Sequence, residues 1–65
     1  MTLTHYSNLV RSHLYRRHNK SAREARELTG RHRAFLSGQL SALTHPSTAA
    51  SLVLVRDGFS MRPVA

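Results

Sequence analysis

The sequence predicts a mainly α protein: an antiparallel helical hairpin of residues 3–18 and 21–43, followed by a short C-terminal β-hairpin or third helix. Two stretches carry apolar residues at steps of three and four, which is typical of amphipathic helices. A short polar break separates these stretches, and the composition changes after Pro46. At 65 residues, the chain has room for a single small domain spanning residues 1–65.

The first predicted helix covers residues 3–18. Leu3, Tyr6, Val10 and Leu14 follow one another at helical spacing and form one apolar face. Residues 1–20 contain no acidic side chain, so this helix belongs to the most basic segment of the chain.

The second predicted helix covers residues 21–43. Ser21 and Glu24 match a capping box, in which the hydroxyl and the carboxylate satisfy the first free backbone N–H groups. An apolar stripe at about 100° per residue then predicts the face that packs against the first helix. This stripe contains Ala25, Leu28, His32, Phe35, Leu36, Gln39, Leu40 and Leu43.

Small side chains recur every fourth residue on the opposite face of this helix. A glycine inside a helix costs about 1 kcal/mol relative to alanine, so two of them need a reason. Close approach of another backbone is such a reason. We therefore expect a docking surface, called the small-residue strip, made of Gly30, Ala34, Ser37, Gly38 and Ser41. Alternatively, Gly30 ends one short helix and a second helix begins near Arg31.

The C-terminal segment, residues 47–64, is predicted as a ribbon or a helix. Asp57-Gly58 between apolar runs favours a type I′ turn, and hence a β-hairpin that joins about 52–56 with 59–62. The competing interpretation is a third helix from Ser47 to Gly58, which the alanines favour and the valines oppose.

The size of the chain points to a partner. A protein this short buries only about 60% of its unfolded surface, and its core rarely provides more than about 3–5 kcal/mol. The chain has no cysteine for a disulfide or a thiolate metal site. We therefore expect self-association or binding to a larger protein.

The composition excludes several kinds of chemistry. The chain has three acidic residues and no cysteine, and no catalytic set of Ser, His and Asp stands out in its sequence. We therefore expect no catalytic residue, cofactor or small-molecule substrate. Asp57 is assigned to the turn. His32, on the apolar stripe, is expected to be a hydrogen-bonded core residue. No metal site is expected, because no two histidines have the four-residue spacing of a two-histidine site on a helix. The histidines are His5, His13, His18, His32 and His45.

Positive charge is the strongest functional feature. The formal net charge is +7, and nine of the ten basic residues are arginine, whose planar fork suits phosphate and carboxylate groups. A solvated basic face with no ligand is the alternative. We expect contacts to nucleic acid or to an acidic surface from Arg11, Arg16, Arg17, Lys20, Arg23, Arg31 and Arg33.

Two functional hypotheses follow. In the first, the protein is a small regulator or inhibitor of phage or plasmid type, which docks on a larger protein such as a repressor or polymerase through the small-residue strip. In the second, the basic hairpin binds DNA or RNA directly. A helix-turn-helix motif fits poorly, because the apolar stripe continues after Gly30 where a turn is needed. No apolar run reaches the roughly 20 residues of a membrane span, and we expect a cytoplasmic location.

Overall fold

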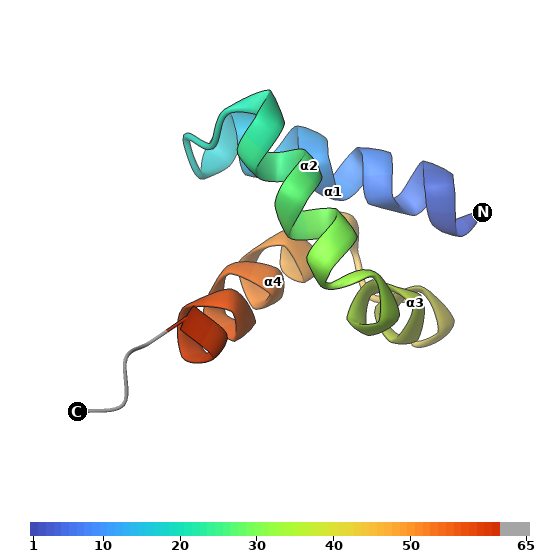
Figure 1. Ribbon diagram of the computed structural model, residues 1–65. Helices are drawn as coiled ribbons and strands as arrows, with labels where there is room; N and C mark the ends of the chain where they lie inside the picture. The colour runs from blue at the N-terminus through green and yellow to red at the C-terminus, as the bar shows by residue number, and fades with distance from the viewer. Residues whose placement is uncertain (62–65) are drawn as a thin grey trace.

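Within the described residues, the chain folds into four α-helices and no strand (Figure 1). The computed structural model describes the backbone of residues 1–61 and the side chains of residues 1–58. The helices are α1 (Leu3–Arg17), α2 (Ala22–Arg31), α3 (Arg33–Ser41) and α4 (Pro46–Met61). The predicted mainly α class is confirmed, whereas the predicted hairpin followed by a β-hairpin is wrong.

Helix α1 has the predicted extent to within one residue. The Thr2 side chain caps it by accepting a hydrogen bond from the His5 backbone N–H at 3.1 Å. After the helix, Asn19 adopts a left-handed backbone with φ 54°, which asparagine tolerates better than most residues. The Lys20 N–H donates back to the Leu14 carbonyl at 3.1 Å, so the chain turns sharply into α2.

The capping box at the start of α2 is confirmed. The Ser21 hydroxyl accepts from the Glu24 N–H at 3.1 Å, and the Glu24 carboxylate accepts from the Ser21 N–H at 3.2 Å. These two bonds satisfy two backbone donors that the first turn of a helix leaves free.

The predicted continuous helix 21–43 is wrong, because it is interrupted at His32. His32 has φ −106° and ψ 28°, outside helical geometry, and α3 begins at the next residue. The bend allows α3 to pack against both α1 and α4 and to bury Leu36. The alternative prediction of two short helices was right about the break. Its position was slightly wrong, because the first helix ends at Arg31 rather than Gly30 and the second begins at Arg33.

Residues 46–61 form helix α4, so the predicted β-hairpin of 52–56 with 59–62 is wrong over the described residues. Pro46 occupies the first helical position, which suits its fixed φ. The Ser47 N–H donates to Nδ1 of His45 at 3.2 Å and so caps the start. The helix continues through Gly58 rather than ending there. Residues 62–64 of the predicted ribbon lie outside the described residues.

The core lies where α1 meets the other three helices, each of which it contacts. In Figure 1, α2 starts beside the C-terminal end of α1 and descends across it, toward α3 and α4. The core is formed by Tyr6, Val10, Leu14, Ala25, Leu28, Leu36, Ala49, Ala50 and Val53.

Two residues of the predicted apolar stripe depart from it. Phe35 is only half-buried and packs at the edge of the core, where the Arg56 guanidinium lies 4.9 Å from its ring centre. Leu43 is 88% exposed, because it follows the end of α3 and has a left-handed backbone with φ 59°. The predicted stripe therefore ends at Leu40.

Among the described residues, no helix combines the length and hydrophobicity needed to cross a lipid bilayer.

Candidate binding surfaces

The small-residue strip is exposed along its whole length. All five of its residues, Gly30, Ala34, Ser37, Gly38 and Ser41, are accessible to solvent. A Cβ atom built on Gly30 or Gly38 would meet no atom within 4 Å. The break at His32 places Gly30 on α2 and the other four residues on α3. No element of the described chain covers this strip, so its role in docking stays a prediction.

Just after the strip in the sequence, Leu43 presents an exposed apolar side chain. It follows Ser41 and Ala42 at the end of α3, where the backbone turns away toward α4. From Ala34 to Leu43 the sequence contains no charged residue. Beyond Arg33, α3 therefore contributes no charged side chain, and the exposed apolar side chain of Leu43 follows its end.

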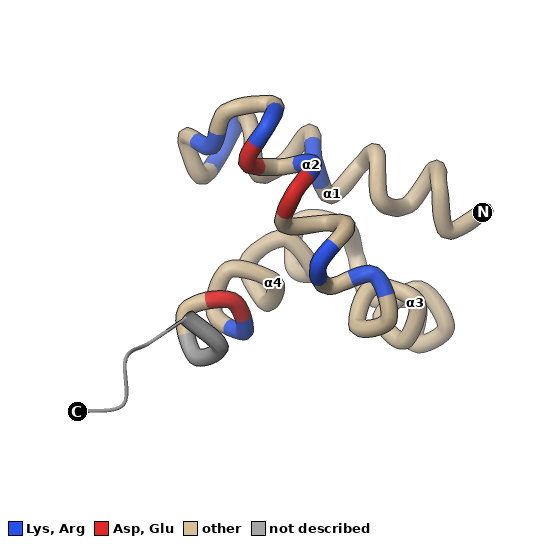
Figure 2. Tube along the Cα trace, viewed as in Figure 1, with Lys and Arg blue, Asp and Glu red and all other residues tan. Residues whose placement is uncertain are grey.

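All three acidic side chains of the chain, Glu24, Glu27 and Asp57, line one groove between α2 and α4. Figure 2 shows the acidic segments on these two helices. The groove has a volume of about 150 Å³, and Lys20 and Arg31 are among its other lining residues. The negative charge of the protein is therefore concentrated on one side.

Within this groove, Asp57 joins two helices. Its Oδ1 lies 2.6 Å from Nη1 of Arg31 and 3.0 Å from Nε2 of His32. The hydrogen bond to His32, and secondarily the Arg31 guanidinium, lower the pKa of Asp57 below its usual value. The assignment of Asp57 to a turn was wrong. The prediction that His32 is a buried, hydrogen-bonded residue is confirmed.

The sequence analysis missed this pairing, although one indication was present. A histidine on an apolar stripe needs a polar partner, and Asp57 is the only aspartate in the chain. The pairing was not predicted, because Asp57 was assigned to a turn.

Three of the seven predicted basic site residues lie close to carboxylates. Arg31 pairs with Asp57, and Lys20 lines the same groove. Arg23 pairs with Glu27 one turn along α2 at 3.2 Å, with both side chains exposed, so this pair contributes little stability. These three residues offer less free positive charge than the sequence analysis assumed.

Arg16 and Arg17 lie in the last turn of α1 and are exposed. Their positive charge is favourable there, because the carbonyl end of a helix carries a partial negative charge. Their contact with nucleic acid or an acidic surface stays a prediction.

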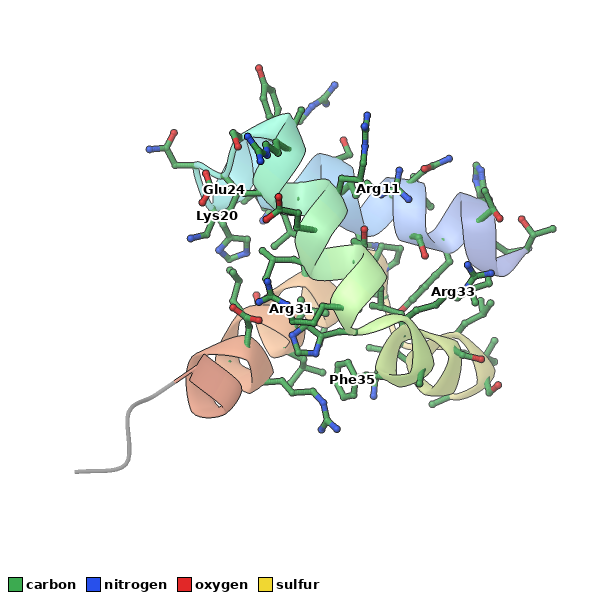
Figure 3. The ribbon with its side chains drawn as sticks, viewed as in Figure 1. Arg11, Lys20, Glu24, Arg31, Arg33 and Phe35 are labelled. Atoms are coloured by element: carbon green, nitrogen blue, oxygen red, sulfur yellow. The ribbon has the colours of Figure 1, made fainter. Side chains whose placement is uncertain are left out.

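Arg11 and Arg33 line a different depression, here called the α1–α2–α3 notch, with a volume of about 80 Å³. Nε of Arg11 donates to the Thr29 hydroxyl at 2.9 Å. In Figure 3, both arginines lie on one side of α2, and Lys20, Glu24 and Arg31 lie on the other. The sequence analysis missed the hydroxyl residues here, because nothing in their spacing connects them. The notch is lined by Leu3, Thr4, Ser7, Arg11, Thr29, Gly30 and Arg33.

In the described part of the chain, no three His, Cys, Asp or Glu side chains form a group that could hold a metal ion. Comparisons of the sequence and the fold with protein-family models, curated proteins and solved structures found no match.

Proposed function

We propose that the protein is a small basic regulator or inhibitor that docks on a larger protein through the small-residue strip. One observation carries the proposal: the strip is exposed and uncharged from Ala34 onward, and no described element packs on it. Each of its two glycines destabilises its helix by about 1 kcal/mol relative to alanine. A closely packed partner backbone would offset that cost.

The second part of this proposal concerns the role of two exposed arginines in the approach of the partner. Arg16 and Arg17 are exposed at the end of α1, away from the uncharged residues of α3. Charges outside the contact area of an interface act through long-range electrostatics, which mainly accelerate encounter and set orientation. The partner we propose, for example a transcriptional repressor or a polymerase, therefore presents a flat surface with acidic residues nearby.

The test is affinity capture with the intact protein as bait, after nuclease treatment of the lysate. Gly38→Leu places a large side chain on the strip, and Thr48→Leu places the same side chain on the exposed surface of α4. We expect a protein that the original sequence and Thr48→Leu capture, and that Gly38→Leu does not. Circular dichroism checks that both variants stay helical. Equal capture by all three proteins would remove the strip from the interface.

Direct binding of nucleic acid is the second candidate. It is favoured by the separation of charge, since no acidic residue lines the notch that contains Arg11 and Arg33. Binding through phosphates would weaken steeply between about 50 and 200 mM salt in a mobility-shift assay. Absence of binding at the lower salt concentration would contradict this candidate.

A further inference from the structure

We propose that the α1–α2–α3 notch is a binding site for one phosphate group. This site goes beyond the proposed docking surface and shares only Gly30 with it. The proposal rests on the charge of the notch, on the fixed position of Arg11, and on the size and lining of the notch.

The notch is electrostatically suited to an anion. Arg11 from α1 and Arg33 from α3 both line it, whereas all three acidic side chains line the groove between α2 and α4. Two arginines from different helices therefore border a small volume whose lining contains no carboxylate. A phosphate oxyanion would provide the missing negative charge and accept charge-assisted hydrogen bonds.

Arg11 is held in place before any ligand binds. Its Nε donates to the Thr29 hydroxyl, which itself donates to the Ala25 carbonyl at 3.0 Å. Because this contact uses only Nε, the Nη groups of Arg11 remain as donors for a second acceptor. A side chain that is already ordered loses less conformational entropy on binding.

The size and the remaining lining fit a phosphate group. The notch, with a volume of about 80 Å³, has room for more than one water molecule and therefore for a phosphate group. The hydroxyls of Thr4 and Ser7 add donors that can rotate toward an oxygen. Gly30 has no side chain, so the entrance stays open on that side. The rest of a phosphate ester would lie outside the notch.

The site is tested by following backbone amide resonances during a titration with inorganic phosphate, at constant ionic strength against sodium chloride. We expect saturable changes at Thr4, Ser7, Thr29 and Gly30. Arg33→Gln removes one exposed guanidinium from the notch and should weaken the affinity about tenfold. Arg56→Gln removes the same charge from the exposed surface of α4, outside the notch, and should leave the affinity unchanged.

Two outcomes would overturn the proposal. One is the absence of saturable changes in the notch at millimolar phosphate. The other is an equal loss of affinity in Arg33→Gln and Arg56→Gln, which would indicate a general counterion atmosphere. With the site established, a short 5′-phosphorylated oligonucleotide and its dephosphorylated form identify the source of the phosphate. Tighter binding than inorganic phosphate, lost on dephosphorylation, assigns the site to a terminal phosphate ester.

Discussion

Individual polar side chains join distant parts of this small protein. Tyr6 reaches the carbonyl of Thr44, 38 residues away, and Arg11 reaches Thr29 on α2. A buried or half-buried hydrogen bond contributes about 1 kcal/mol net. In a domain whose core provides only about 3–5 kcal/mol, each such bond is a considerable share of the stability.

Removing the Tyr6 hydroxyl should destabilise the fold measurably. Its O–H donates to the Thr44 carbonyl at 2.7 Å, and burial raises the pKa of this phenol. Tyr6→Phe keeps the buried ring and loses the bond, so we expect a decrease in the free energy of unfolding of about 1 kcal/mol. Urea denaturation measures this change. Tyr15→Phe is the matched control, because Tyr15 is 61% exposed. Equal effects in the two variants would contradict the role given to the Tyr6 bond.

At the scale of the element, the end of α3 is closed by two backbone hydrogen bonds. The Thr44 N–H donates to the Gln39 carbonyl at 2.9 Å, and the Leu43 N–H donates to the Leu40 carbonyl at 3.0 Å. This is the Schellman pattern, whose left-handed position normally holds glycine. Here that position holds Leu43, which is both strained and exposed.

Leu43→Gly should therefore stabilise the isolated protein. Glycine removes the steric cost of a left-handed residue, so we expect an increase of about 1 kcal/mol in the free energy of unfolding. Thermal or urea denaturation is the measurement, and Leu43→Ala, which keeps a Cβ atom, should change little. A destabilised glycine variant would mean that the leucine side chain makes contacts that support the fold.

The same variant bears on the docking proposal. If Leu43 contacts the partner, Leu43→Gly should be more stable than the original sequence and should no longer capture the partner. This is the result expected where a strained residue is retained because it binds a partner.

At the scale of the whole molecule, charge is unevenly distributed. The three carboxylates line one groove, together with Lys20 and Arg31, whereas no carboxylate lines the notch that holds Arg11 and Arg33. His13 of α1 and His45 before α4 face each other, with ring centres 6.1 Å apart. We therefore expect the fold to lose stability in acid.

Stability should fall as the pH is lowered through the histidine range. Burial, followed by the charges of Arg17, His45, Arg16 and His18, lowers the pKa of His13 below 6.5. Below pH 6.5, the unfolded chain therefore takes up a proton that the folded state still excludes. Neutral His13 contributes its full stabilisation above pH 6.5. This contribution decreases as the pH falls, and the decrease ends once the pH is below the lowered pKa of His13 in the folded protein. The Asp57 carboxylate acts only at lower pH, because its pKa is lowered from 3.8.

Urea denaturation at about pH 7.5 and about pH 5.5 measures this effect. His13→Gln should lose less stability between the two pH values than the original sequence does. The control His5→Gln changes an exposed histidine near the N-terminus and should preserve the full loss. An identical pH dependence in His13→Gln would assign the acid sensitivity to other groups.

Local chemistry made several features predictable. The capping box of Ser21 and Glu24 acts within four residues, and the apolar spacing of α1 depends on one helix alone. The exposure of the predicted docking residues also agrees with their position opposite the apolar stripe. The pairing that lines the notch, Arg11 with Thr29, joins two helices and has no counterpart in the spacing of the chain.

By itself, the sequence determined the helical class, the starts of the first two helices, the basic character and the lack of covalent bracing, because each follows from neighbouring residues or from composition. Only the tertiary structure decided that residues 46–61 form a helix and that the second helix breaks at His32. Both choices depend on long-range contacts: the burial of Ala49, Ala50 and Val53 in the core that α1 organises, and the bond from His32 to Asp57. Local preferences for helix and turn were nearly balanced there, so packing between distant residues settled the outcome.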